Sequence, residues 1–251
     1  MRRHLIAGNW KMYKTAPETT AYFEAFLPLV KDVRDRDIAI CPPFVNIPAA
    51  HASTSGSNVE IGGQNLYWVK EGAYTGEVSG PMLKAVGCRY VIVGHSERRQ
   101  YFGETDATVL SRTNAALEAD LTPIVCVGER LEEREAGSTE AVLLGQCRTG
   151  VTCIAPSAFE RLVIAYEPVW AIGTGHTATP EMAAEAHALI RREVASTFGN
   201  EVAAKTRILY GGSVKPDNID GLMAQEGIDG VLVGGASLDP QSFARIVKFQ
   251  A

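Results

Sequence analysis

The sequence of 251 residues has no basic surplus. Its 24 Lys and Arg residues are outnumbered by 29 Asp and Glu residues, so the formal net charge is −5 at pH 7. Proteins that bind nucleic acid neutralise phosphates with an excess of Lys and Arg. We therefore expect no nucleic-acid partner, although a small anionic ligand can still bind where positive charge is concentrated locally.

Long hydrophobic runs are also lacking. No window approaches the roughly 20 apolar residues of a membrane span. The apolar stretch near the N-terminus is too short for the hydrophobic region of a secretory signal. We therefore expect no membrane association and a cytoplasmic location.

Cysteine is scarce and poorly arranged for cross-links. The five cysteines are odd in number and form no CxxC, which favours reduced thiols over a disulfide framework or a zinc site. No two histidines have a spacing that would bring them together at a strand end. We expect the protein to work without a metal ion or a cofactor.

What the sequence does contain is one repeated pattern: a short run rich in Val and Ile, a small or polar residue, and then a stretch of helical character. Continuous apolar runs are typical of parallel strands that helices cover. There is no low-complexity segment or linker, so we expect a single domain over residues 1–251. The eight runs are HLIAGNW (4–10), DIAICPP (37–43), VEIGGQN (59–65), YVIVGHS (90–96), TPIVCVGE (122–129), LVIAYEP (162–168), TRILYGG (206–212) and GVLVGG (230–235).

Helices are predicted between these runs, for example over 105–120 and 179–198. The second begins Thr179-Pro180-Glu181, an N-cap followed by proline and an acid. Eight strands alternating with helices over about 250 residues match a closed (β/α)8 barrel. The alternative is an open doubly wound sheet, which typically has fewer strands and a GxGxxG turn after the first strand that is lacking here.

Polar residues follow most of the predicted strands, on the face where barrels of this kind carry their active sites. They are Asn9 and Lys11, Gln64 and Asn65, His95 and Glu97, Glu129, and Glu167. Lys11 can act electrostatically on an anionic substrate, although most lysines are simply solvated. His95 precedes a predicted short helix, whose positive end disfavours protonation of the imidazole.

Glycine clusters close the last two strands, at 211–213 and 234–237, and each precedes an expected helix start, near 214–216 and 238–240. Glycines allow backbone N–H groups to approach a ligand closely, and helix N-termini favour anions. Glycines can also serve only to form tight turns. Two clusters on neighbouring strands favour a phosphate site, which is where this fold commonly places one.

Five segments together resemble the triosephosphate isomerase family. In order they are AGNWKM (7–12), VIVGHSERR (91–99), YEPVWAIGTG (166–175), YGGSVKPDN (210–218) and VGGASL (233–238), and GAYTGEVS (72–79) extends the similarity. The resemblance covers the whole chain. It implies the interconversion of dihydroxyacetone phosphate and D-glyceraldehyde 3-phosphate.

The resemblance also implies roles for individual residues. Glu167 is expected to be the base and His95 the neutral electrophile, with Glu97 in a supporting role. Lys11 and Asn9 are expected to bind the substrate and stabilise negative charge. The phosphate is expected to lie on backbone N–H groups of Gly173, Ser213, Gly234 and Gly235.

A homodimer is a further implication of the resemblance. Residues 64–79 resemble the family's interface loop, with a tip near Thr75 that inserts into a second subunit. Two departures from the family pattern are Tyr13, where a small polar residue is common, and His176, where a lysine is common. The first concerns the interface rather than the chemistry.

The stretch 168–178 is longer than an ordinary connection between a strand and a helix, which favours a lid beside the base. Residues 168–170 and 174–176 would be its hinges and residues 171–173 its apolar tip.

Two other functions fit parts of the sequence. Glu97, Glu129 and Glu167 also suit a barrel glycoside hydrolase, which predicts more aromatic residues at the strand ends than Trp10 and Trp170. A non-catalytic phosphate-binding or scaffold barrel predicts the loss of Lys11, His95 or Glu167, and all three are present.

Overall fold

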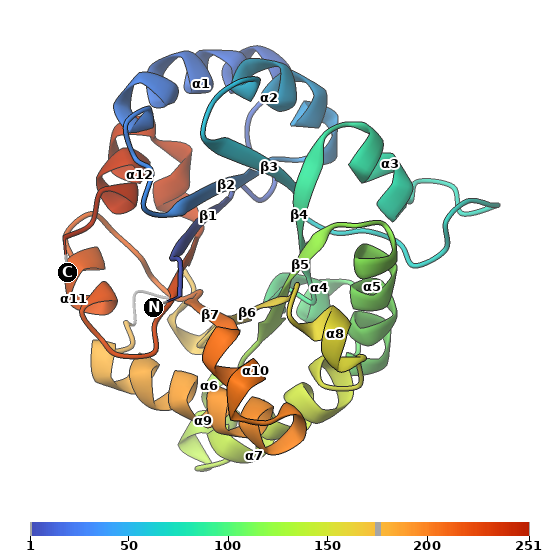
Figure 1. Cartoon of the computed structure of the whole chain (residues 1–251), viewed down its shortest axis with the longest axis vertical. Helices are drawn as coiled ribbons and strands as arrows, with labels where there is room; N and C mark the ends of the chain where they lie inside the picture. Colours follow the sequence, from blue (N-terminus) through green and yellow to red (C-terminus); the bar gives the residue numbers. More distant parts are fainter. Residues whose placement is uncertain (1, 174–176, 251) are drawn as a thin grey trace.

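In the computed structural model, which describes residues 2–173 and 177–250, eight parallel strands close into a barrel (Figure 1). Each strand pairs with the next, and the first pairs with the last. The barrel prediction is confirmed, and each expected run supplies one strand. The strands are β1 (Leu5–Asn9), β2 (Asp37–Cys41), β3 (Val59–Gly63), β4 (Cys88–Val93), β5 (Thr122–Val127), β6 (Val163–Tyr166), β7 (Arg207–Tyr210) and β8 (Gly230–Val233).

Helices surround the barrel (Figure 1). They are α1 (Ala16–Val30), α2 (Ile47–Thr54), α3 (Gly80–Ala85), α4 (Ser96–Tyr101), α5 (Asp106–Glu118), α6 (Leu131–Glu135), α7 (Thr139–Gln146), α8 (Pro156–Phe159), α9 (Pro180–Phe198), α10 (Asn200–Lys205), α11 (Ile219–Met223) and α12 (Pro240–Val247). Short turns of other helix types are η1 (Phe44–Asn46), η2 (Cys147–Val151), η3 (Val169–Ala171) and η4 (Gly235–Leu238). None of the described helices is both long enough and apolar enough to cross a membrane.

The two helices predicted in most detail are α5 and α9. Thr105 caps α5 by accepting the N–H of Thr108, and Thr179 caps α9 by accepting the N–H of Met182 at 3.2 Å. Each cap satisfies a backbone donor that the first turn of a helix leaves free. The predicted positions of both helices are confirmed.

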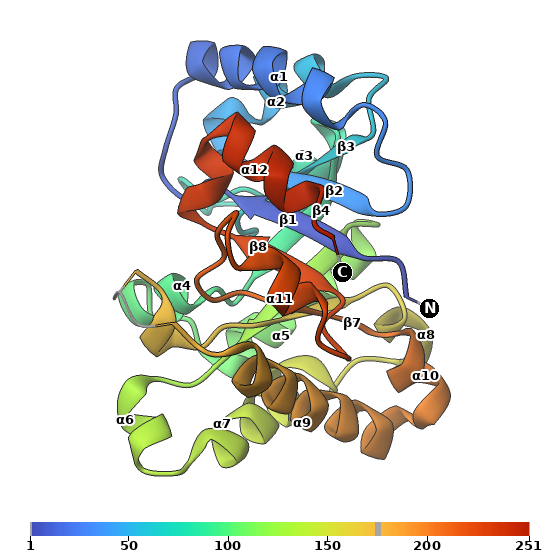
Figure 2. The ribbon, with the colours of Figure 1, turned by 90° about the vertical axis from the view of Figure 1, so that its left-hand side faces the viewer.

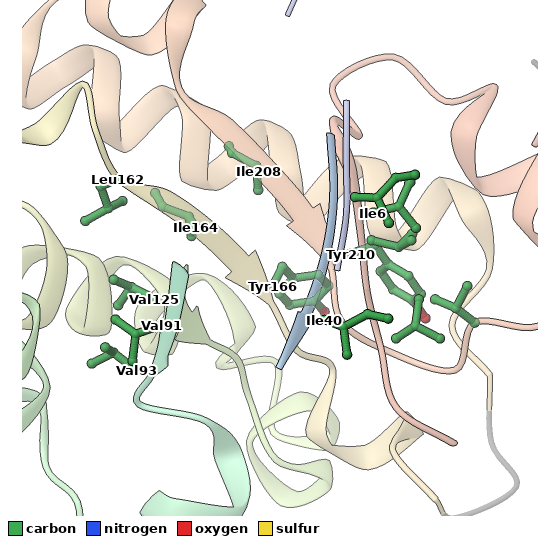
Figure 3. Packing of buried hydrophobic residues seen from close by; sticks show 14 of the residues in the cluster. Ile6, Ile40, Val91, Val93, Val125, Leu162, Ile164, Tyr166, Ile208 and Tyr210 are labelled. Atoms are coloured by element: carbon green, nitrogen blue, oxygen red, sulfur yellow. The ribbon is translucent and has the colours of Figure 1, made fainter. Parts of the chain in front are cut away.

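In every strand except β3, alternate residues belong to two separate hydrophobic clusters, because successive side chains point to opposite faces of a sheet. One cluster is small and is made mainly of Leu, Ile, Ala and Cys side chains, such as Leu5, Ile92 and Cys126. The other joins the strands to the helices and includes Ile6, Val93, Val125 and Tyr166 (Figure 3). Strands buried on both faces explain the continuous apolar runs.

Of the two helix starts predicted after the glycine clusters, one was wrong. The helix expected near 214–216 begins only at Ile219. The Asn218 side chain instead holds a turn, because its Oδ1 accepts the N–H of Lys215 at 2.8 Å and its Nδ2 donates to the Ser213 carbonyl at 3.0 Å. The start expected near 238–240 is confirmed, since α12 begins at Pro240 with Asp239 as its cap.

The stretch after Glu167 is more ordered than expected. Residues 169–171 form the short helix η3, and Ala171, expected in the apolar tip of the lid, is fully buried. The second expected hinge, Thr174-Gly175-His176, lies outside the described residues.

Candidate active site

Three of the predicted polar side chains meet at one end of the barrel. Asn9 is the last residue of β1, His95 lies two residues beyond β4, and Glu167 directly follows β6. In Figure 2 the arrowhead of β1 points to the side where α4 and α6 lie, away from the chain ends. Together with Lys11, the three residues line a cavity of about 400 Å³.

Glu167 makes two hydrogen bonds in this cavity. Its Oε1 lies 2.9 Å from His95 Nε2, and its Oε2 accepts the backbone N–H of Ser96 at 2.9 Å. Burial alone would raise the pKa of Glu167, but His95, the Ser96 N–H and Lys11 together hold that pKa below its ordinary value. Glu167 is therefore a carboxylate at neutral pH and can accept a proton.

His95 is buried and is also the N-cap of α4. Its Nδ1 accepts the N–H of Glu97 at 3.2 Å, so the proton of the neutral ring is on Nε2, which faces Glu167. Burial lowers the pKa of His95, but the Glu167 carboxylate, with a smaller contribution from Glu97, raises it above its ordinary value. The expectation that the helix N-terminus decides the protonation of His95 is thus incomplete, because a carboxylate 2.9 Å away has the stronger influence.

Lys11 is held in an unusual backbone conformation. Its φ of 52° is in the left-handed region, which is costly for a residue other than glycine. Its N–H donates to Asn9 Oδ1 at 3.0 Å and its Nζ to Glu97 Oε1 at 2.6 Å, while its carbonyl accepts Gln64 Nε2 at 2.8 Å. Backbone and ammonium group are therefore both fixed beside the cavity.

Glycines form a second part of the cavity lining, the glycine wall, next to the charged side chains, since a β-carbon on Gly234 would lie 3.4 Å from Lys11 Cε. The predicted phosphate residues Gly173, Ser213, Gly234 and Gly235 all line it. Side chains would not fit everywhere on this wall, since a β-carbon on the neighbouring Gly212 would lie 2.2 Å from the Tyr210 hydroxyl. The cavity therefore has one wall of charged and polar side chains and another of glycines.

Glu97 lies in an adjoining hollow rather than in this cavity. The two hollows share Asn9, Lys11 and His95, and the second also contains Tyr13. Exposed apolar side chains surround it, including Met12 and Phe102 at 93% and 66% exposure. The site is thus continuous with an exposed apolar surface.

A metal ion is not needed to explain this geometry. Within residues 2–173 and 177–250, no group of three or more His, Cys, Asp or Glu side chains is arranged to hold one. The charged groups of the cavity and of the adjoining hollow instead bond to one another, as Glu167 does to His95 and Glu97 to Lys11.

Comparison with known proteins gives one consistent result. The family model described as "Triosephosphate isomerase" matches residues 4–250. The triosephosphate isomerase of Solibacter usitatus is 62% identical over 249 residues, which are 99% of this chain and 100% of the relative. That of Chloroflexus aurantiacus is 54% identical over 250 residues, with 100% of both chains covered.

The chain belongs to the triosephosphate isomerase family. A solved structure agrees: the crystal structure of triosephosphate isomerase from Bartonella henselae superposes with a TM-score of 0.89 and 40% identity over 97% of each chain. The resemblance seen in the five sequence segments is thereby confirmed.

Some contributors to the site of this family member were not predicted. The Ser96 N–H that donates to Glu167 is a backbone group, so the type of residue at position 96 does not predict it. Its position directly after His95 was the one available signal. Lys215 lines the cavity beside Ser213. Gln64 was noted only as a strand-end residue, and its bond to the Lys11 carbonyl could not be foreseen without the fold.

Proposed function

We propose that this chain, an aldose–ketose isomerase by its family, interconverts dihydroxyacetone phosphate and D-glyceraldehyde 3-phosphate with Glu167 as the base and His95 as the electrophile. The observation that carries the proposal is the pairing of the two side chains at 2.9 Å within the cavity. A base and a hydrogen-bond donor side by side suit the removal of a proton from the carbon next to a carbonyl group.

Glu167 would take the proton from one substrate carbon and return it to the neighbouring one. Its lowered pKa supports this role, because the base must be ionised before the substrate arrives. Both carboxylate oxygens are engaged by His95 and Ser96. The carboxylate would therefore turn from these partners to the substrate carbon.

His95 would donate its Nε2 proton in a hydrogen bond to the substrate carbonyl oxygen as the enediolate forms. The bond from the Glu97 N–H to Nδ1 supports this tautomer. Once Glu167 turns to the substrate, the influence that raises the pKa of His95 is weakened, and the buried ring stays neutral.

Lys11 and Asn9 would bind the substrate and offset the negative charge of the enediolate. Glu97 would support them, since its carboxylate holds the Lys11 ammonium at 2.6 Å. The left-handed backbone of Lys11 gives further support, because strained residues cluster at functional sites.

The phosphate would bind on the glycine wall, at backbone N–H groups of Gly173, Ser213, Gly234 and Gly235, all of which line the cavity. The short helix η4 begins at Gly235, and the N-terminal N–H groups of such a turn suit an anion.

The segment that begins at Pro168 would close as a lid over the bound substrate. In the present conformation Trp170 Nε1 donates to Glu129 Oε1 at 2.9 Å, and the Arg134 guanidinium lies 4.6 Å from the Trp170 ring. Closure would exclude water and protect the enediolate from losing its phosphate.

A homodimer would form through residues 64–79, with the tip near Thr75 entering the second hollow of the other subunit. The loop projects beyond α3 (Figure 1) and is stiffened by Tyr67, whose ring stacks at 4.1 Å on Trp68 and lies 4.7 Å from Tyr74. The exposed apolar side chains around the hollow support this interface, because exposed apolar patches mark sites where another protein surface binds. Removing the tip, residues 72–79, should give a monomer by light scattering, and an unchanged dimer would refute the assignment.

We also propose two properties of the whole protein. One is that residues 1–251 form a single domain. The other is a cytoplasmic location, supported by five free cysteines, as expected in a reducing compartment.

The decisive experiment is a coupled assay of glyceraldehyde 3-phosphate formation from dihydroxyacetone phosphate, without added metal or cofactor. Folded protein should turn over substrate, and activity no higher than background would disprove the function. Glu167→Gln should lower kcat by about 10²–10⁴-fold. A near-normal kcat in that variant would show that another residue is the base.

A further inference from the structure

Strand β4 stops short of its neighbour β5. The last paired residues are Val93 and Val125, after which the β4 chain turns to bring His95 into the cavity. β5 runs on to Val127, and the chain continues through Gly128. Backbone groups of this stretch that face β4 therefore lack a strand partner, and buried backbone groups left unpaired are costly.

Two side chains take the place of the missing strand. Arg99 Nη2 donates to the Cys126 carbonyl at 3.2 Å. Gln146, the last residue of α7, accepts the Gly128 N–H on Oε1 at 2.7 Å and donates from Nε2 to the Gly128 carbonyl at 3.0 Å. An amide side chain carries the same donor and acceptor as a peptide unit, so Gln146 extends the sheet by one residue.

The other side of this stretch faces the base. The N–H of Glu167 donates to the Val127 carbonyl at 2.7 Å, and the N–H of Val169 donates to the Glu129 carbonyl at 3.0 Å. Between these two bonds, Gly128 lies directly against the Glu167 backbone, where a β-carbon would come within 1.7 Å of the Glu167 carbonyl oxygen. The position of Gly128 thus sets the position of Glu167.

We propose that Gln146 is a positioning residue for the base. By bonding both backbone groups of Gly128, it fixes the end of β5 at its contact with Glu167. The inference rests on the proposed role of Glu167, and extends it to a side chain that does not line the cavity. Displacement of a catalytic group by about 1 Å can lower the rate about 100-fold.

The test compares Gln146→Met, which keeps the length of the side chain but removes both bonds, with the unaltered protein. We expect kcat to fall at least about 10-fold with KM within about twofold, since the proposed phosphate wall is untouched. The matched control is Gln241→Met, at an exposed position in α12, which should behave as the unaltered protein.

A second measurement separates positioning from a loss of folded protein. Substrate deuterated at the carbon that loses its proton should give a larger isotope effect on kcat in Gln146→Met, because proton transfer to a displaced base becomes slower. Loss of folded protein alone would leave the isotope effect unchanged. An unchanged isotope effect or an unchanged kcat would overturn the inference.

If Gln146→Met does not fold, Gln146→Glu replaces it in the test. This variant keeps an acceptor for the Gly128 N–H and loses the donor to the Gly128 carbonyl. We expect Gln146→Glu to raise the isotope effect on kcat as well. An isotope effect equal to that of the unaltered protein would overturn the inference. Failure of the proposed function looks different, because the unaltered protein itself would then show no turnover.

Discussion

Gly128 and Glu167 touch backbone to backbone: a β-carbon on Gly128 would lie 1.7 Å from the Glu167 carbonyl oxygen. Backbone atoms at this place cannot move aside as the end of a flexible side chain can. Any residue larger than glycine must therefore separate the ends of β5 and β6, where the proposed base emerges.

Gly128→Ala should consequently reduce both activity and stability. We expect the free energy of unfolding to fall by about 3 kcal/mol, as in severe overpacking, and kcat to fall with it. The measurements are urea unfolding and the isomerase assay.

Gly145→Ala is the control for that change, because nothing lies within 4 Å of its added β-carbon and it sits inside α7. It should raise stability by up to about 1 kcal/mol. If both alanine variants had the same stability, the contact between the two strands would not matter as described.

Stability should depend on pH through His187. The ring is fully buried in α9, Nδ1 lies 3.1 Å from the Gly227 carbonyl oxygen, and burial lowers the pKa of His187 from 6.5 to about 4. Between these two pH values the unfolded chain binds a proton that the folded chain does not, so unfolding is favoured as the pH falls.

The loss should begin near pH 6.5, reach about 3 kcal/mol near pH 4 and then level off. Urea unfolding of the unaltered protein and of His187→Gln, measured from pH 8 downwards, isolates this contribution. The difference between the two proteins should change across the window, and a constant difference would show that His187 does not contribute.

Gln64 should matter for substrate binding although it is not expected to touch the substrate. Its Nε2 donates to the carbonyls of Lys11 and Cys41 at 2.8 and 2.9 Å, which ties the left-handed Lys11 to the end of β2. In Gln64→Met the strained backbone of Lys11 can relax, and we expect kcat/KM to fall about 10-fold. Steady-state kinetics that stay within twofold of the unaltered protein would contradict this.

Pro168 should contribute to the rate rather than to the fold. It restricts the preceding Glu167 to extended geometry and is the cap of η3. Pro168→Ala should lower kcat about 10-fold while leaving the thermal midpoint nearly unchanged. Pro156→Ala, at an exposed proline that begins α8, is the comparison and should retain full activity; equal kcat in both variants would exclude the role.

The sequence predicted the eight strands because most of their residues are buried on both faces of the sheet and therefore appear as short apolar runs. It also grouped Asn9, His95 and Glu167 correctly, since the carboxyl ends of all barrel strands open on one face. These inferences need only the order of the elements.

Other features depended on distances that the order of elements does not give. Gln146 could not be singled out, because its importance arises where β4 ends before β5. The raised pKa of His95 likewise depends on Glu167, which is distant in sequence. Glu167 also accepts the N–H of Ser96, 71 residues before it. The late start of α11 follows from the hydrogen bonds of one side chain, Asn218.

The pairing of β1 with β8 has a consequence for refolding. Lys11 and the glycines at 234–235 face the same cavity only when β1, near one end of the chain, has paired with β8, near the other end. Contacts this distant in sequence form late, because a long loop must be closed first. Recovery of enzyme activity after dilution from urea should therefore lag behind the return of helical circular dichroism, which makes turnover a reporter of the last step of assembly.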